Sequence, residues 1–209
     1  MRAWRRWSYR DCLAAMRAFT DRRDAGTADE LWLVEHEPVF TLGLSGRREH
    51  LLAPGDIPVV ETERGGQVTY HGPGQVVAYP LIDVRRRGIG PRALVTALES
   101  AVIELLAGYG LETHADPKAP GVYLGSAKIA AVGLRIRRGA SYHGVALNVD
   151  MDLTPFARIN PCGHPGLAVT QLREHFPGVA AADVAAQLGA GIARGLGYTG
   201  TIDLPDSLP

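Results

Sequence analysis

The chain has 209 residues, a formal net charge of zero and a hydrophobic content of 46%, values that are typical of a soluble globular protein. The balanced charge argues against general binding to nucleic acid. No segment has the length and apolarity of a membrane-spanning helix or of a secretory signal. We therefore expect a cytoplasmic protein with neither nucleic acid nor a membrane as a partner, and one domain over residues 1–209.

Apolar residues recur with helical spacing over residues 11–24, which predicts a first helix. Strands are then expected at 30–36, 39–42, 59–62, 67–70 and 75–84. A second helix is expected to begin at Pro91 and to end at Gly108 and Gly110. Strands follow at 122–124, 128–137 and 141–150, and a last helix at 181–196. Because strands predominate without strict alternation with helices, we predict an α+β fold in which helices cover a mixed β-sheet.

Cys162 lies between Pro161, which fixes its own φ, and Gly163, which permits a sharp turn. Such a backbone is suited to presenting a nucleophile at the tip of a loop. Cys12 is the only other cysteine, so a disulfide scaffold is not the obvious explanation, although a single Cys12–Cys162 bridge remains open. Two cysteines in a chain of this length indicate a reducing compartment.

Lysine occurs only at Lys118 and Lys128 among 22 basic residues. A buried lysine amine can lose its proton, whereas arginine stays charged. Lys128 lies in a run of small and apolar residues from Gly125 to Gly133. A surface lysine on a strand edge is the alternative, but the small neighbours leave the side chain little apolar cover. We therefore favour Lys128 as the group that exchanges a proton with Cys162.

The segment from Arg64 to Gln75 carries four glycines in twelve positions, which lets a backbone approach a ligand closely. It lacks the Lys-Ser/Thr ending of a phosphate-binding loop, and a glycine-rich hairpin is the alternative. Arg64 and His71 favour ligand binding, because such turns need no flanking cation.

Other polar residues gather further along the chain. His143 and Asn148 are either a pair of donors near the site or structural groups. A zinc site could be imagined from the following residues: His71, His143, Cys162 and His164. Their spacing matches no standard ligand pattern, so we expect no metal.

Taken together and in this order, these motifs resemble the lipoyl(octanoyl)transferase family of lipoate synthesis. The markers are the segments 35–43, 64–75, 128–133, 143–148, 152–156 and 161–163. One departure is Tyr123, where the family more often has tryptophan. The resemblance implies the fold of the catalytic domains of biotin and lipoate protein ligases. It also implies an acyltransferase that moves octanoyl or lipoyl groups from acyl carrier protein to a lysine of lipoyl domains, including those of 2-oxoacid dehydrogenases and the glycine cleavage H protein.

The resemblance further implies that Cys162 becomes an acyl-thioester and that Lys128 is its partner. The implied substrate-binding positions are Arg64, Gly65, Gly66, Gln67, Val68, Thr69, Tyr70, His71, Ala131, Val132, Gly133, Gly144, Val145 and Ala146. Neither ATP nor a metal is expected, because the acyl donor is already activated. Plausible walls of an acyl tunnel are Val132, Leu134, Val145 and Leu147, with core packing as their alternative role.

Two other functions remain open at this point. An ATP-dependent lipoate or biotin ligase shares the implied fold, but it forms an adenylate and needs no cysteine. A non-catalytic module that binds acyl carriers or lipoyl domains is the second alternative. Arginine clusters at 2/5/6, 85–87 and 135/137/138 would dock acidic carriers, although a solvated arginine-rich face explains each cluster equally well.

Overall fold

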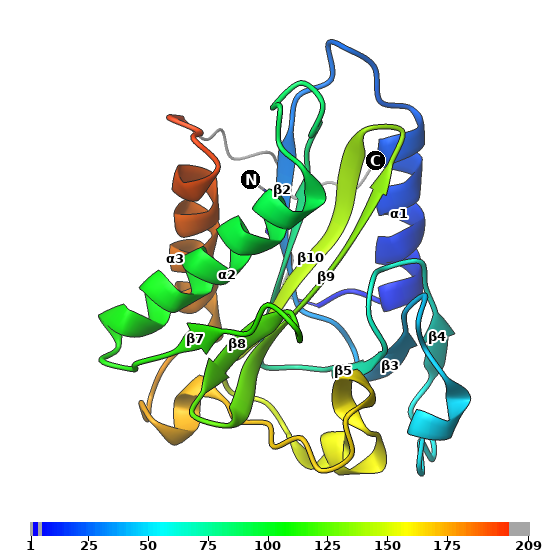
Figure 1. Ribbon diagram of the computed structural model, residues 1–209, viewed down its shortest axis with the longest axis vertical. Helices are drawn as coiled ribbons and strands as arrows, with labels where there is room; N and C mark the ends of the chain where they lie inside the picture. The colour runs from blue at the N-terminus through cyan, green and yellow to red at the C-terminus, as the bar shows by residue number, and fades with distance from the viewer. Residues whose placement is uncertain (1, 4–5, 201–209) are drawn as a thin grey trace.

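A computed structural model describes residues 2–3 and 6–200 (Figure 1). Its main element is a seven-stranded sheet with the order β1-β2-β6-β10-β9-β8-β7. In that order the strands are β1 (Arg2–Ala3), β2 (Glu30–Val34), β6 (Gln75–Leu81), β10 (Ala140–Asn148), β9 (Ala127–Arg137), β8 (Gly121–Leu124) and β7 (His114–Ala115). A second sheet has the order β4-β3-β5. Its strands are β4 (Val59–Glu61), β3 (Val39–Leu42) and β5 (Val68–His71).

Both sheets are mixed. Strand β1 runs parallel to β2, and β3 runs parallel to β4, whereas the other described pairs are antiparallel. The helices are α1 (Tyr9–Asp21), α2 (Pro91–Gly108) and α3 (Ala181–Gly195). The predicted α+β fold, a mixed sheet covered by helices, is therefore confirmed.

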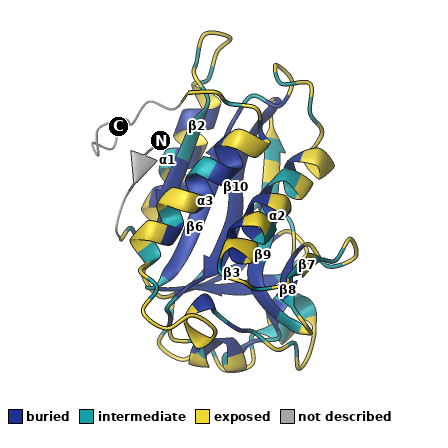
Figure 2. Cartoon of the chain, turned by 90° about the vertical axis from the view of Figure 1, so that its left-hand side faces the viewer, coloured by how far each residue is buried: buried dark blue, intermediate teal, exposed yellow. Residues whose placement is uncertain are grey.

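The strands of the large sheet alternate their side chains between two cores, as a pleated strand requires. On β6, Val76 and Ala78 pack in the core beneath α2 and α3, whereas Val77 and Tyr79 pack beneath α1. Helices α2 and α3 lie on one side of the sheet and α1 lies on the other (Figure 1). In Figure 2 the central strands are buried and the outward sides of α2 and α3 are exposed.

A third apolar cluster joins the small sheet to turns in the second half of the chain. The rings of Phe40, Tyr70 and Phe156 pack in sequence, with centroids 5.5 Å apart at both contacts. The 3-10 turns are η1 (Arg48–His50), η2 (Thr154–Arg158), η3 (Pro161–Gly163) and η4 (Leu172–Glu174). This cluster fixes η2 against β5 and so supports the segment that leads to Cys162.

The predicted helices and strands all exist, and their ends differ by a few residues. Helix α1 begins at Tyr9, two residues before the predicted start, because Cys12, Met16 and Phe19 share its buried face with Tyr9. Strand β6 ends at Leu81 rather than at 84, since Asp83 accepts a hydrogen bond from the backbone N–H of Arg86 and turns the chain. The two-residue strands β1 and β7 are too short to produce a periodic signal and were not predicted.

Among the described residues, no helix is both long and apolar enough to cross a bilayer. The N-terminal arginine cluster lies partly outside the described residues, because Arg5 is not among them.

Candidate active site

Lys128 lies on β9 at an irregularity in its pairing with β8. Val122 pairs with Ala130 and Tyr123 pairs with Lys128, so Ile129 is an extra residue on β9. A bulge of this kind re-aims the neighbouring side chains. The side chain of Lys128 turns inward, and only 4% of the residue is exposed.

The backbone of Lys128 binds the segment that follows Cys162. Its N–H donates to the carbonyl of Ala168 at 2.8 Å, and its carbonyl accepts from the N–H of Thr170 at 3.1 Å. The strand that carries the lysine therefore also holds the chain just beyond the cysteine.

Cys162 occupies the middle of the tight turn η3. Its φ is 57°, in the left-handed region that a residue with a side chain adopts only at a cost in strain. The N–H groups of Gly163 and His164 donate within the turn to the carbonyls of Asn160 and Pro161, at 2.9 and 3.0 Å. Both N–H groups are therefore already paired within the turn.

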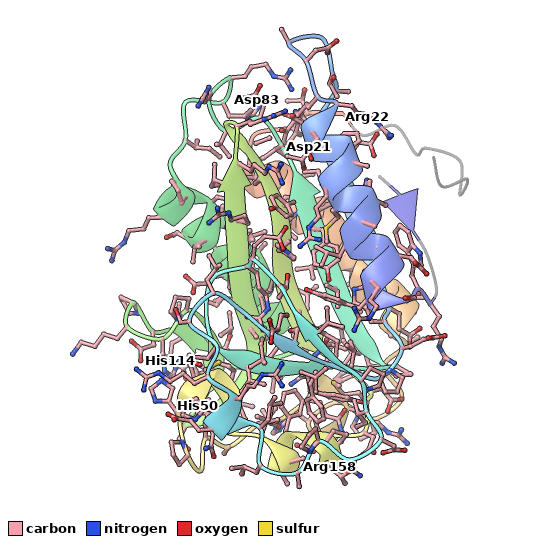
Figure 3. All side chains as sticks on the ribbon, turned by 90° about the vertical axis from the view of Figure 1, so that its right-hand side faces the viewer. Asp21, Arg22, His50, Asp83, His114 and Arg158 are labelled. Carbon is pink, nitrogen blue, oxygen red and sulfur yellow. The ribbon has the colours of Figure 1, made fainter. Side chains whose placement is uncertain are left out.

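Turn η1 anchors the other side of this loop. The N–H of Asn160 donates to the carbonyl of His50 at 2.9 Å. Figure 3 shows His50 on η1 at the end of the molecule that also carries Arg158 of η2. The turn that presents Cys162 is thus held on both sides: η1 binds the chain just before Cys162, and β9 binds the chain just after it.

The two candidate catalytic side chains meet. The Nζ of Lys128 donates to the Sγ of Cys162 at 3.0 Å and to the carbonyl oxygen of Pro120 at 3.1 Å. The same Nζ lies 5.0 Å from the centre of the Tyr123 ring, so the aromatic residue that departs from the family pattern faces the ammonium. The structure therefore brings together the cysteine and the lysine that the sequence singled out.

Two opposing effects act on the charge of Lys128. Burial lowers its pKa, but the charge of Cys162 and the hydrogen bond to it raise the pKa, and the net result lies above the ordinary value of a lysine. Lys128 therefore stays an ammonium beside the sulfur. Arg64 lies within electrostatic reach as well: burial lowers its pKa, and Cys162 is among the groups that oppose this shift.

The pair opens on a cavity of about 430 Å³, a size typical of a small-ligand site. The predicted binding residues that line it are Arg64, Gly65, Gly66, Gln67, Val68, Thr69, His71, Ala131, Val132, Gly133, Gly144, Val145 and Ala146. Tyr70 is the exception, because its ring packs between Phe40 and Phe156 in the apolar cluster. Of the predicted tunnel walls, Val132, Leu134 and Val145 line the cavity, whereas Leu147 belongs to the core beneath α2 and α3.

Arg64 and His71 line the cavity, and each also makes hydrogen bonds within the protein. The guanidinium of Arg64 donates to the carbonyls of Thr41, Gly65 and Gln67, so it holds the glycine-rich loop from within. His71 is buried and its Nδ1 lies 2.7 Å from the Oε1 of Gln75. Burial lowers the pKa of His71 well below the ordinary value, so His71 contributes a neutral ring to the cavity that it lines.

Two glycines of the cavity wall are required by packing between backbones. A Cβ on Gly144 would lie 2.0 Å from the carbonyl oxygen of Ala78, on the neighbouring strand. A Cβ on Gly133 would lie 2.9 Å from the carbonyl oxygen of Gly65. Gly144 therefore lets β10 and β6 approach each other, and Gly133 lets β9 approach the glycine-rich loop, and both glycines line the cavity.

Several residues of the cavity were not predicted from the sequence. They are Tyr9, Ser45, Val77, Tyr79, Pro91, Val95, Lys118, Ala119, Pro120 and His164. His143, one of the two possible donors that the sequence suggested, lines the cavity, whereas Asn148 is structural: it accepts from Gln75 at 2.9 Å and donates to the carbonyl of Thr170 at 3.0 Å. Tyr9 and Tyr79 gave no signal, because an aromatic residue on a buried helix or strand face is most often part of the core.

The described residues contain no group of three or more histidine, cysteine or acidic side chains arranged to hold a metal ion. Cys12 and Cys162 are both free. The bridge that the sequence left open is therefore not formed.

Comparisons with known proteins agree with this geometry. Residues 8–193 match the family model described as the lipoyl protein ligase A/B catalytic domain. An octanoyltransferase from Alkalilimnicola ehrlichii is 65% identical over 167 residues, which are 80% of this chain and 78% of that protein. One from Chromohalobacter salexigens is 65% identical over 186 residues, which are 88% and 84% of the two chains.

Among solved structures, a lipoate-protein ligase A bound with ATP superposes with a TM-score of 0.77 at 17% identity. The match covers 98% of this chain and 89% of that one. At this level of identity the likeness establishes a common fold and nothing more.

Proposed function

This chain belongs to the octanoyltransferases of the lipoyl protein ligase A/B family, and from this premise we propose that Cys162 carries the octanoyl group between donor and acceptor, with Lys128 as its proton-transfer partner. The predicted family, the enzyme class and a role in octanoyl transfer are confirmed by the named relatives. The observation that carries the proposed mechanism is the 3.0 Å contact between the Nζ of Lys128 and the Sγ of Cys162.

In the first half-reaction the Cys162 thiolate attacks the carbonyl carbon of an octanoyl thioester on the carrier. The new C–S bond forms, the bond to the carrier sulfur breaks, and the Lys128 ammonium gives a proton to the departing thiolate. One thioester replaces another, so this step is close to thermoneutral. The raised pKa of Lys128 supports an ammonium as the starting form.

In the second half-reaction the amine of an acceptor lysine attacks the Cys162 thioester. Lys128 has by then given its proton to the departing carrier thiolate, so its amine is neutral and takes the proton of the attacking nitrogen. The amide forms, Cys162 leaves as a thiolate, and the ammonium–thiolate pair is restored. Amide formation from a thioester is downhill, so it draws the cycle forward.

The two alternatives from the sequence make different demands on the site. A ligase must activate a free acid with ATP, whereas a thioester donor is already activated, and we propose that neither ATP nor a metal takes part. A non-catalytic binding module has no use for a strained, left-handed Cys162 against a buried ammonium. The geometry of this pair therefore favours transfer over both alternatives.

The proposed partners are acyl carrier protein as donor and lipoyl domains, including those of 2-oxoacid dehydrogenases and the glycine cleavage H protein, as acceptors. Of the arginine clusters, Arg86 is paired with Asp29 and Arg87 stacks over Tyr198. Lys118 lines the mouth of the cavity and is exposed, which suits an acidic carrier or its phosphopantetheine. The free thiols support the proposed cytoplasmic location.

The proposal is tested by mixing the protein with octanoyl-acyl carrier protein and measuring intact mass. We expect one octanoyl adduct on the wild type and none on Cys162→Ala. Cys12→Ala is the matched control, because Cys12 is fully buried and burial raises its pKa, so this variant should keep the adduct. An adduct on Cys162→Ala would refute the mechanism, and retained activity of that variant with ATP and free octanoate would favour a ligase.

A further inference from the structure

A buried carboxyl group lies close enough to Lys128 for the lysine charge to act on it. Glu99 belongs to α2, is 8% exposed, and accepts a hydrogen bond at its Oε1 from the N–H of Gly121 at 2.8 Å. Burial raises the pKa of Glu99, and the bond from Gly121 and the charge of Lys128 offset only part of this rise. A helix on one face of the sheet therefore contributes a carboxyl group to the surroundings of the lysine.

The hydrogen bonds form a continuous series through one peptide unit. The N–H of Gly121 and the carbonyl of Pro120 belong to the same peptide, and that carbonyl accepts from the Nζ of Lys128 at 3.1 Å. The series thus runs from Glu99 through this peptide to the ammonium, and from the ammonium to the sulfur of Cys162.

Gly121 is required where the peptide passes the lysine. Its φ is 142°, and a Cβ would lie 3.0 Å from the Cε and 3.2 Å from the Nζ of Lys128. The same Cβ would lie 2.5 Å from the carbonyl oxygen of Ala130. The peptide is therefore held between β9 and the glutamate, with little freedom to rotate.

We propose that Glu99 is a positioning residue for the Cys162–Lys128 pair: it orients and polarises the Pro120–Gly121 peptide so that its carbonyl holds the Lys128 ammonium against the sulfur. Hydrogen bonds in series strengthen one another in a site of low dielectric, and a carboxylate is a stronger acceptor than a neutral oxygen. Without Glu99 the N–H of Gly121 loses its buried acceptor, and with it the Pro120–Gly121 peptide loses the hydrogen bond that fixes its orientation. The other titratable groups that face Lys128 are Cys162 and Tyr123.

The effect on the reaction is measured as the single-turnover rate of octanoyl transfer to the enzyme over a range of pH. This measurement relies on the proposed role of Cys162. We expect Glu99→Gln, which keeps an acceptor oxygen without the charge, to be acylated about tenfold more slowly, and Glu99→Leu about a hundredfold more slowly. The loss should fall on kcat rather than KM, and the alkaline limb of the pH profile should move to lower pH. Glu104→Gln, an exposed change on the same helix, is the control and should behave as wild type.

The charge of Lys128 provides a second measurement that does not depend on catalysis. The chain has only two lysines, so protein labelled with ¹³C,¹⁵N-lysine gives two sets of side-chain resonances, and Lys118 serves as the internal reference. We expect the pKa of Lys128 to fall in both Glu99 variants while that of Lys118 is unchanged. A residue that merely stabilised the fold would lower the melting temperature without moving either the titration or the pH profile.

An unchanged Lys128 titration together with an unchanged pH profile in folded Glu99→Gln would overturn the inference. Should neither variant fold, the wild type still decides, because the amide proton of Gly121 should titrate together with the carboxyl carbon of Glu99, and independent behaviour would refute the link. A wild type that forms no octanoyl adduct would refute the proposed function instead, and the lysine titration would still judge the role of Glu99.

Discussion

Replacing Lys128 by methionine should separate activity from stability. Methionine has a similar length and fills the same space, but it has neither a charge nor a proton to give. Only 4% of Lys128 is exposed, so the change removes a buried ammonium together with its bonds to Pro120 and Cys162.

The two effects differ greatly in size. Positioned proton transfer contributes about 10²- to 10⁴-fold to a rate, which corresponds to about 3–5 kcal/mol of transition-state stabilisation. For the fold, the two lost hydrogen bonds cost about 1–3 kcal/mol each, but removing a buried ammonium recovers a desolvation penalty of several kcal/mol. The two largely cancel, and a residual of about 1 kcal/mol moves the melting temperature by about 2–4 °C in a protein of this size.

Quenched-flow acylation followed by intact mass, with thermal unfolding on the same samples, measures both quantities. We expect Lys128→Met to be acylated at least a hundredfold more slowly, with a melting temperature within about 5 °C of wild type. Lys128→Arg is the charge-preserving control for the fold. It keeps the positive charge, but its planar, forked guanidinium does not reproduce the compact ammonium of lysine. An acylation rate within threefold of wild type would refute the proton-transfer role. Loss of the folded state would refute the argument that the lost hydrogen bonds and the recovered desolvation penalty largely cancel.

Two further predictions concern the fold around the site. Gly144→Ala places its Cβ 2.0 Å from the Ala78 oxygen and should destabilise the protein by about 3 kcal/mol. Gly65→Ala, where the nearest atom to the new Cβ is 3.5 Å away, should cost under about 1 kcal/mol. Equal melting temperatures of the two variants would contradict this. His36 is buried, and burial lowers its pKa from 6.5 to about 4 despite the carbonyl of Trp7. The unfolded chain therefore takes up the proton first, and about 3 kcal/mol of stability should be lost as the pH falls from about 6.5 to 4. In denaturant titrations, His36→Gln should flatten this part of the pH dependence, and an unaltered slope would count against a neutral buried His36.

Much of this site could be predicted from the sequence, because its key residues differ from the residues around them. Cys162 lies between a proline and a glycine, and Lys128 is one of two lysines in an arginine-rich chain. The first feature is a backbone constraint and the second is a choice of residue type, and both can be seen in the sequence without knowledge of the fold. Periodicity similarly located α2 and the central strands, since their apolar faces are long.

Residues that act through the tertiary arrangement were not predictable in this way. Glu99 follows Leu98 on an amphipathic helix, where a charged residue ordinarily faces solvent, and only the crossing of α2 over β8 brings it to Gly121. The structural part of the role of Arg64 was not predictable either, because a sequence cannot reveal that its donors satisfy the carbonyls of its own loop. In both cases the deciding partner is a backbone group, and backbone groups leave no trace in the amino-acid pattern.

The proposed catalytic pair, Cys162 and Lys128, is joined in two ways, and we therefore expect that its chemistry can be removed without loss of the fold. One connection is the contact between Nζ and Sγ. The other is the backbone pairing of Lys128 with Ala168 and Thr170, which fixes the chain just beyond Cys162 whatever side chain stands at position 128. Because the backbone sets the distance, the side chains are free to change charge during the cycle. In the proposed cycle Lys128 therefore gives a proton while it faces a thiolate and accepts one when it faces a thioester, without any movement of the strand that carries it.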